Sequence, residues 1–318
     1  MKPRILLVGK NGQVGAELAT FLPQIGDVAA YGHEQLDLTL PEQIRQRVRE
    51  IQPNLIVNAA AFTNVDQAEK DQQAAYSINA TAPRILAEEA KRTGALLVHF
   101  STDYVFDGAS ERPYNENDKT NPINLYDETK LAGEKAIQEI GPSHLIFRTA
   151  WVYATAGRNF LLTILRLASE REELKIVRDQ IGAPTWSQEI ARATTSVLGT
   201  IVRETEVPRP EAGGIYHMTA EGEASWYEFA LAILEEASRL PPGVPWFDRS
   251  TGGRAIVTRR VIPITSEEYP TPARRPLHSV LSNQKLFSTF GVQLPDWRKQ
   301  LHDAFREKIG DHPLDAQR

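Results

Sequence analysis

The sequence of 318 residues contains no cysteine, so it can form neither a disulfide nor a metal site with cysteine ligands. It also lacks any apolar run near the ~20 residues that a membrane-spanning helix requires, and its first apolar segment reads as a strand rather than as a signal peptide. Acidic residues outnumber basic ones, and the formal net charge of −5 argues against a nucleic-acid-binding surface. We therefore expect a cytoplasmic globular protein that binds neither a membrane nor a nucleic acid.

A glycine-rich turn follows the first apolar run. Arg4–Val8 precedes residues 9–15 (GKNGQVG), and helical spacing continues from residue 16. Strand, glycine turn and helix are the order typical of a dinucleotide-binding site. Gly9 permits the tight turn, Gly12 lets the backbone approach a diphosphate, and Gly15 lets helix and strand pack closely. The spacing G-x-x-G-x-x-G by itself also suits an ordinary strand-to-helix turn.

Strand and helix patterns alternate over the first half of the chain. The sequence predicts further strands at 27–31, 54–61, 95–100 and 144–148, and helices at 41–51 and 71–93. Strands with continuous apolar runs are buried on both faces, as in a parallel sheet. The pattern therefore predicts an α/β fold with a Rossmann-type doubly wound parallel sheet, whose ligands bind at the carboxyl ends of the strands.

Proline and glycine interrupt the second half more often. Helices are expected at 159–171, 188–203, 225–239 and 297–308. We expect a dinucleotide-binding domain over residues 1–155, to which later segments return. Residues 156–318 would mainly form a smaller mixed α/β domain for the substrate, over the carboxyl edge of the sheet.

Tyr126 and Lys130 lie four residues apart on an expected helix and therefore share one face. A tyrosine has a pKa near ~10, and a fixed cation beside it lowers that pKa, so such a pair can exchange a proton with a substrate. Tyr-x-x-x-Lys alone often arises by chance on an ordinary helix surface. The glycine turn upstream favours the catalytic interpretation.

Several longer strings resemble one known family. The glycine turn, residues 58–61 (NAAA), 101–108 (STDYVFDG) and the Tyr-x-x-x-Lys pair resemble the extended short-chain dehydrogenases. Within that group, the chain is similar to the dTDP-4-dehydrorhamnose reductase family at 61–69 (AFTNVDQAE), 147–153 (FRTAWVY), 179–185 (DQIGAPT), 214–218 (GIYHM) and 269–276 (YPTPARRP). The resemblance runs from residue 4 to about residue 300.

This resemblance implies an oxidoreductase that uses NADPH or NADH to reduce the 4-keto group of a dTDP-linked deoxysugar. It assigns catalysis to Tyr126 as proton donor, to Lys130, which would keep the phenol acidic and bind the nicotinamide ribose, and to Thr102, which would hydrogen-bond the carbonyl. Asp103 and Trp151 match substrate contacts, although Trp151 alone would read as a core residue. The cofactor contacts it implies are Gly9, Asn11, Gly12, Gln13, Val14, Gly15, Asp37, Leu38, Ala59, Ala60, Ala61, Thr63, Tyr126 and Lys130.

Other charged residues have plainer interpretations. Asp37 without the family would read as part of a helix cap, His99 and His217 as structural residues in strands, and Asp66 and Glu69 as a polar helix face. Residues 274–275 (RR) suit either a diphosphate contact or a solvated pair. Both interpretations of these two arginines, the diphosphate contact and the solvated pair, therefore stay open.

The family resemblance also implies Mg²⁺ held by glutamates between the subunits of a homodimer. Glu17 matches one ligand, but Gln188 and Gln284 stand where the other carboxylates are expected. Neutral amides are poor replacements for the carboxylate ligands of a hard cation, so we assign no metal-ligating residues, and both the Mg²⁺ and the homodimer that it would bridge are in doubt here.

Three rival functions share parts of this pattern. A sugar-nucleotide dehydratase would need a glutamate after Asp103, where this chain has Tyr104. An epimerase would show no net cofactor oxidation. A non-catalytic subunit resembling the regulatory subunit of methionine adenosyltransferase would have no need of Tyr126 and Lys130, and both are present.

The end of the second expected strand addresses the choice of cofactor. NAD-selective enzymes place an acid there to bind the ribose 2′-hydroxyl, whereas this chain has Gly32, with His33 and Glu34 next. Lys10 offers a further cation. We expect use of both cofactors with a modest preference for NADPH.

Overall fold

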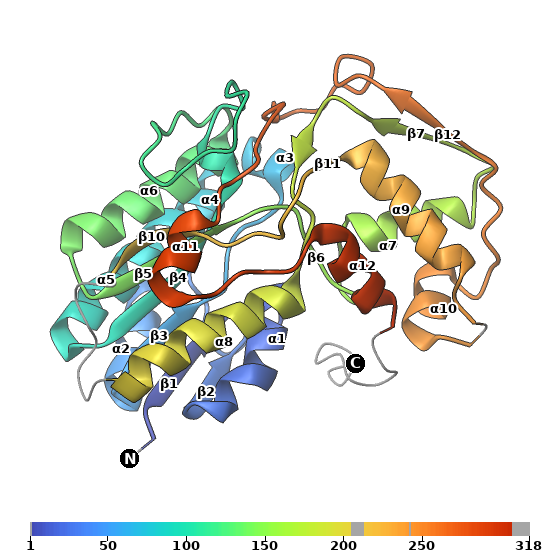
Figure 1. Cartoon of the computed structure of the whole chain (residues 1–318). Coiled ribbons are helices and arrows are strands. Elements are labelled where there is room, and N and C mark those ends of the chain that lie inside the picture. The colour runs from blue at the N-terminus through green and yellow to red at the C-terminus, as the bar shows by residue number, and fades with distance from the viewer. Residues whose placement is uncertain (1, 205–212, 242, 307–318) are drawn as a thin grey trace.

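A six-stranded parallel sheet forms the centre of the computed structural model, which describes residues 2–204, 213–241 and 243–306 (Figure 1). The strand order is β10-β5-β4-β3-β1-β2. The bounds are β1 Arg4–Val8, β2 Asp27–Tyr31, β3 Leu55–Asn58, β4 Leu96–Thr102, β5 His144–Thr149 and β10 Gly214–His217. The predicted doubly wound α/β fold is confirmed, and the expected third strand is shorter than 54–61.

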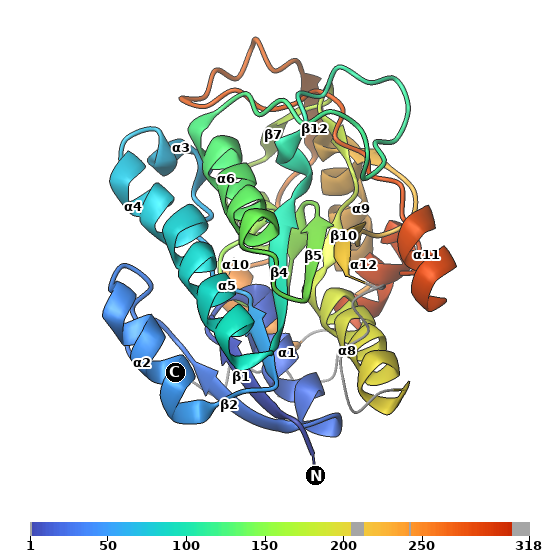
Figure 2. The same cartoon turned by 90° about the vertical axis from the view of Figure 1, so that its left-hand side faces the viewer.

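Alternate side chains of each strand enter two different cores. Ile5 and Leu7 of β1 pack with α1 (Gln13–Phe21) and α8 (Ser187–Glu204), whereas Leu6 and Val8 face the opposite layer. That layer consists of α2 (Pro41–Ile51), α5 (Ala82–Thr93) and α6 (Leu125–Ile140), and Figure 2 shows α5 and α6 across the sheet from α8. Burial on both faces explains the continuous apolar runs of the sequence.

The strand order changes direction between β1 and β3, because β1 pairs with β2 on one side and with β3 on the other. The loops that leave these two strands therefore diverge, and a crevice opens between them at the carboxyl edge. The glycine turn follows β1 and the alanine run 59–61 follows β3. This arrangement places both predicted cofactor segments at the same crevice.

The helix expected at 71–93 is one helical stretch of three kinds. It comprises α4 (Gln72–Tyr76), a π-helical turn η2 (Ser77–Thr81) and α5, which ends at Gly94 with φ +71°. A π-helical turn often marks a functional position, and this one carries the buried Asn79. Hydrophobic spacing alone could not have predicted it.

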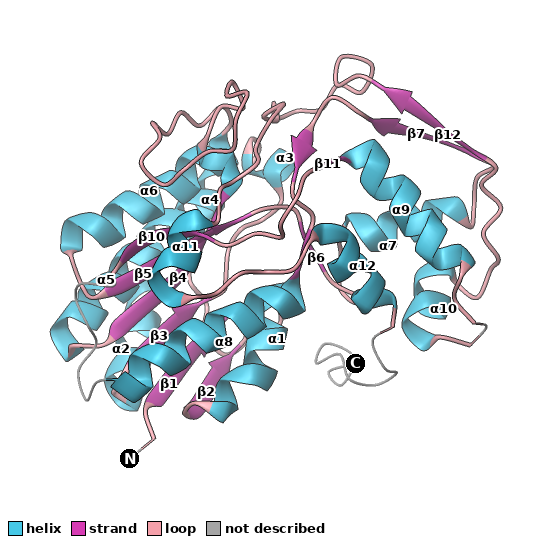
Figure 3. Cartoon of the chain, in the orientation of Figure 1, coloured by secondary structure: helices cyan, strands magenta, loops and turns pink. Residues whose placement is uncertain are grey.

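A second group of elements packs around its own apolar core (Figure 3). It contains α7 (Phe160–Ala168), α9 (Trp226–Ser238), α10 (Pro245–Thr251) and α12 (Trp297–Phe305), together with the parallel strands β7 (Glu173–Val177) and β12 (Arg260–Ile264). The expected helix at 297–308 extends into residues outside the described ranges. Helix α8 and strand β10 return to the first layers, so the chain passes repeatedly between the two groups.

Short elements connect the two groups near the carboxyl edge of the sheet. Two-residue strands pair as β6 (Val152–Tyr153) with β9 (Thr185–Trp186) and as β8 (Ile181–Gly182) with β11 (Ala224–Ser225). The remaining described elements are η1 (Leu22–Gln24), α3 (Val65–Ala68), η3 (Asp103–Val105) and α11 (Gln284–Phe290). None of the helices in the described ranges is long and apolar enough to cross a membrane.

Candidate active site

A cleft of about 660 Å³ opens at the crevice between β1 and β3. Its volume falls in the range of small-molecule sites. Most of the predicted cofactor residues line it: Gly9, Asn11, Gly12, Gln13, Val14, Leu38, Ala59, Ala60, Ala61, Thr63, Tyr126 and Lys130. Gly15, Asp37, Thr102, Asp103 and Trp151 are outside its lining, whereas Gly32, His33 and Arg158 belong to it without having been predicted as contacts.

The glycines of the turn leave space that a side chain would fill. A Cβ at Gly9 would lie 2.6 Å from the Ala60 backbone nitrogen, and one at Gly15 would collide with the Gly9 carbonyl. Gly12 differs, because its nearest protein neighbour would be 3.4 Å away. The first N–H groups of α1 have no partner within the helix, and the first two residues of this helix, Gln13 and Val14, line the cleft. The turn therefore fits the diphosphate of a dinucleotide.

Asp37 is used by its own loop. Its carboxylate accepts hydrogen bonds from the backbone nitrogen and hydroxyl of Thr39, both at 2.8 Å. Both bonds hold the pKa of Asp37 below its usual value, and the bond from the Thr39 backbone has the larger effect. The predicted adenine contact of Asp37 stays a prediction. Gly32 and His33 line the cleft and Glu34 does not, in keeping with the absence of an acid to select NADH.

Helix α6 carries Tyr126 and Lys130, the predicted catalytic pair. Asn124 caps it by accepting a hydrogen bond from the Asp127 backbone nitrogen at 3.0 Å. The Lys130 ammonium donates to the Phe100 carbonyl at 2.6 Å. Burial lowers the pKa of Lys130 to about 8. Lys130 is thus fixed between β4 and the cleft.

The surroundings of Tyr126 differ from our expectation. Its pKa is raised, first by burial and then by the carboxylates of Asp127 and Asp103, and a hydrogen bond with Thr102 opposes this. The expectation that Lys130 keeps the phenol acidic is therefore wrong for this state of the protein. The physical reason is the burial of the phenol, to which the neighbouring carboxylates of Asp127 and Asp103 add. A protonated phenol at the cleft wall can act as a proton donor.

Two buried carboxylates, those of Asp103 and Asp127, lie close to Tyr126. The Thr102 hydroxyl donates to Asp103 at 3.0 Å and accepts from the Tyr104 backbone nitrogen at 3.2 Å. Burial raises the pKa of Asp103 to about 7 and that of Asp127 to about 9, and the Asp103 carboxylate adds to the shift of Asp127. Thr102 must turn away from Asp103 before it can donate to a substrate carbonyl.

Asn79 holds the loop that follows β3 against α6, a role that no sequence motif indicated. Its amide exchanges hydrogen bonds with the Phe62 backbone at 2.8 and 3.1 Å and donates to the Thr129 hydroxyl at 3.0 Å. A Cβ at Gly133 would collide with the Asn79 carbonyl oxygen. Gly133 therefore permits the close approach of α6 and η2 that this bracing requires.

The Trp151 indole stacks on Trp226, with ring centroids 3.5 Å apart and planes 3° apart. Trp151 has φ +45°, which is uncommon for a bulky residue and marks a constrained position. Gly182 lies against the same indole, since a Cβ there would be 2.5 Å from Trp151 Cε2. The Trp226 Nε1 group donates to Gln180 at 3.2 Å. These residues form an aromatic wall in which sequence reasoning had identified Trp151 alone.

The loop near residue 275 is attached to α3. Arg275 forms an ion pair with Asp66 at 2.7 Å, and Glu69 accepts a hydrogen bond from the Leu125 backbone at 2.9 Å. Asp66 and Glu69 lie at α3, where a polar helix face was expected, and both are half-buried and anchor neighbouring segments. Arg274 is exposed.

Both strand histidines are buried, as their structural interpretation requires. His99 Nδ1 lies 3.1 Å from the Asn58 amide, and burial lowers its pKa well below the usual value. Burial likewise lowers the pKa of His217 to about 3. Both rings are neutral at physiological pH.

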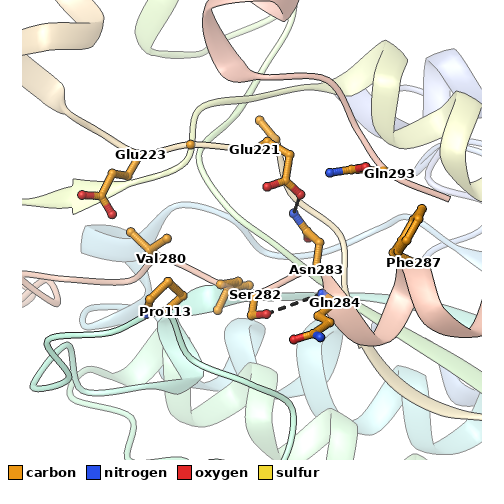
Figure 4. Close-up of a pocket in the computed structure, with 12 residues that line it drawn as sticks. Pro113, Glu221, Glu223, Val280, Ser282, Asn283, Gln284, Phe287 and Gln293 are labelled. Carbon is orange, nitrogen blue, oxygen red and sulfur yellow. Dashed lines mark hydrogen bonds between the residues drawn. The ribbon is translucent and has the colours of Figure 1, made fainter. Parts of the chain in front are cut away.

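The residues considered for a metal are spread over three helices. Glu17 is buried on α1, Gln188 lies near the start of α8, and Gln284 begins α11. Gln284 lines a second cavity of about 550 Å³, where Glu221 accepts a hydrogen bond from Asn283 at 3.0 Å (Figure 4). In the part of the chain that the structure describes, no three His, Asp or Glu residues gather to hold a metal.

Comparison with known proteins identifies close relatives of this chain. A family model described as the RmlD substrate binding domain matches residues 1–309. A dTDP-4-dehydrorhamnose reductase of Burkholderia thailandensis is 48% identical and covers 93% of this chain and 95% of its own length, and that of Escherichia coli K12 is 44% identical with 92% and 94% coverage. The crystal structure of the Bacillus anthracis reductase in complex with NADP superposes with a TM-score of 0.83 at 35% identity, covering 97% of this chain and all of that one.

Proposed function

This chain belongs to the dTDP-4-dehydrorhamnose reductase family, and we propose that it uses NAD(P)H to reduce the 4-keto group of dTDP-4-dehydro-L-rhamnose. The product would be dTDP-L-rhamnose, a nucleotide sugar for cell-surface polysaccharides. One observation carries the proposal: the cleft at the strand reversal joins the open glycine turn to Tyr126 and Lys130. Cofactor and proton donor would thus meet at one wall.

A nicotinamide cofactor, when bound in this cleft, would supply the hydride that C4 of the sugar requires. As negative charge develops on O4, Tyr126 donates its hydroxyl proton to that oxygen. The raised pKa of Tyr126 keeps this proton in place until then. Lys130, fixed by the Phe100 carbonyl, binds the cofactor ribose, and the Thr102 hydroxyl is a second donor to O4.

The aromatic wall and the buried carboxylates orient the sugar nucleotide. Trp151 and Trp226 present a flat apolar surface, and their fixed stacking reduces the entropy lost when a ring binds against them. Asp103 lies beside Thr102 and can accept a sugar hydroxyl close to the reacting carbon.

A spectrophotometric assay tests the proposal. The protein is mixed with dTDP-4-dehydro-L-rhamnose and NADPH, and the absorbance of the reduced cofactor is followed. We expect one cofactor consumed per sugar. Tyr126→Phe, which keeps the ring and removes the proton, should lower kcat by roughly 10²–10⁴-fold while cofactor binding is retained. An epimerase or a non-catalytic subunit would consume no cofactor, and normal turnover by the phenylalanine variant would exclude Tyr126 as the acid.

A further inference from the structure

The loop between β6 and α7 brings a cation into the cofactor cleft. Gly157 and Arg158 line the cleft together with Thr149 and Val152, and all four lie far along the chain from the glycine turn. Arg158 is exposed, and no carboxylate belongs to the described lining of the cleft. The guanidinium therefore meets a cleft without a competing negative charge.

Asn159 fixes this loop to the glycine turn. Its side-chain amide donates to Gln13 Oε1 at 2.9 Å and to the Ala154 carbonyl at 2.8 Å. Its oxygen accepts a hydrogen bond from the Leu162 backbone nitrogen at 3.1 Å and so caps α7. The position of Arg158 is thus set from both sides, by the glycine turn and by the start of a buried helix.

The hydrogen bond between Asn159 and Gln13 also indicates which part of the cofactor lies nearest to Arg158. Gln13 is the first residue of α1, where the free N–H groups of the glycine turn would receive a diphosphate. Gly32 and His33, at the end of β2, belong to the part of the cleft that would receive the adenine ribose and any 2′-phosphate. Arg158 is adjacent in sequence to the residue that contacts Gln13, so the diphosphate is its nearer target.

We propose that Arg158 binds the cofactor diphosphate from the side opposite the glycine turn. The inference rests on the proposed use of a nicotinamide dinucleotide. A guanidinium can donate two parallel hydrogen bonds to phosphate oxygens, which a lysine cannot reproduce with the same geometry. The glycine turn supplies backbone donors on one side and Arg158 supplies a full charge on the other. NADPH and NADH share the diphosphate and both gain from this contact.

Binding without the sugar substrate tests the assignment. Dissociation constants for NADPH, NADH, ADP-ribose and AMP are measured by calorimetry for the wild-type protein and for Arg158→Gln. We expect the affinities for NADPH, NADH and ADP-ribose to fall by a similar factor, roughly 10- to 100-fold, as for the loss of hydrogen bonds to a charged group. The affinity for AMP, which lacks the diphosphate, should hardly change. Arg158→Lys should recover part of the loss.

Arg166→Gln is the matched control. Arg166 lies on α7 and pairs with Glu170 at 3.1 Å, away from the cleft, so this variant should bind as wild type. A loss confined to NADPH would show that Arg158 contacts a 2′-phosphate, and an unchanged affinity for all four ligands would show no phosphate contact. Either result overturns the inference while leaving the reductase activity in place. A wild-type protein that binds none of the dinucleotides would instead overturn the proposed function.

Discussion

The buried ion pair between Glu134 and Arg148 should determine how firmly the catalytic helix is attached to the sheet. Glu134 lies on α6 and accepts two hydrogen bonds from Arg148 on β5, at 2.9 and 2.7 Å. The side chains are only 1% and 3% exposed. The Arg148 guanidinium also lies 5.1 Å from the centre of the Phe106 ring. Because water cannot replace either partner, the loss of one charge leaves the other buried alone.

We expect Glu134→Gln to lower the free energy of unfolding by about 3–5 kcal/mol, the cost of removing one partner from a buried pair. Unfolding entropy near ~2.1 cal/mol/K per residue, over 318 residues, converts this into a fall in Tm of about 4–8 °C. Urea unfolding at neutral pH measures the free energy, and calorimetry measures Tm. Turnover measured well below Tm should fall as well, since Tyr126 and Lys130 share the helix.

Two comparisons separate burial from charge. The double variant Glu134→Leu with Arg148→Met removes both charges and should recover much of the stability lost by the single variant. Glu235 pairs with Arg239 at 2.6 Å on the surface, and Glu235→Gln should cost less than about 1 kcal/mol. If Glu134→Gln costs no more than Glu235→Gln, or if the double variant is no more stable than the single one, the pair is solvated and this reasoning fails.

Three further predictions concern protons and the choice of cofactor. Because the pKa of Lys130 is about 8, kcat/KM should decline as the pH rises through that value and the ammonium is lost. If a Lys130→Arg variant shows the same decline at alkaline pH, another group causes it. The pKa of Asp127 is about 9 in the folded protein, whereas the ordinary pKa of this group is 3.8. Between these two pH values the folded protein holds a proton that the unfolded chain has released. Folding therefore becomes less favourable as the pH rises from about 3.8 to about 9. Asp127→Asn should therefore raise Tm more at about pH 9 than at about pH 5, and an equal effect at both would contradict the shift. Gly32→Asp should raise kcat/KM for NADH relative to that for NADPH. Both values should fall somewhat, because the new Cβ would lie 2.7 Å from Asn11 Nδ2. A wild-type protein that is already strongly selective for NADH would contradict this prediction.

Much of the sheet could be predicted because each strand carries its own information. The second strand occupies Asp27–Tyr31 as expected, and the apolar runs of β4 and β5 continue to Thr102 and Thr149 at the cleft edge. A continuous apolar run needs no knowledge of its partners, since both faces are covered. The pairing of β7 with β12 lies outside such reasoning, because strand partners so far apart in sequence are chosen by tertiary packing.

The same distinction applies to the site. The glycine turn and the Tyr-Lys pair are local motifs, and the structure places both at the cleft. Asn79, Trp226 and Arg158 reach the site through long-range contacts that no local spacing encodes. The clue for Asn79 was present only indirectly, in Gly133, whose missing side chain makes room for it.

The error about Tyr126 is informative for the direction of the reaction. A lysine four residues away suggested a phenol of lowered pKa, which would make Tyr126 a stronger proton donor. The structure buries Tyr126 beside Asp127 and Asp103, and burial first, then these two carboxylates, raise its pKa instead. Such a phenol keeps its proton until negative charge develops on the substrate oxygen, and only then does transfer become favourable. A raised pKa makes the phenol a weaker acid, but it keeps Tyr126 protonated in the resting site, which is the state that a proton donor to the oxygen of a reduced ketone needs.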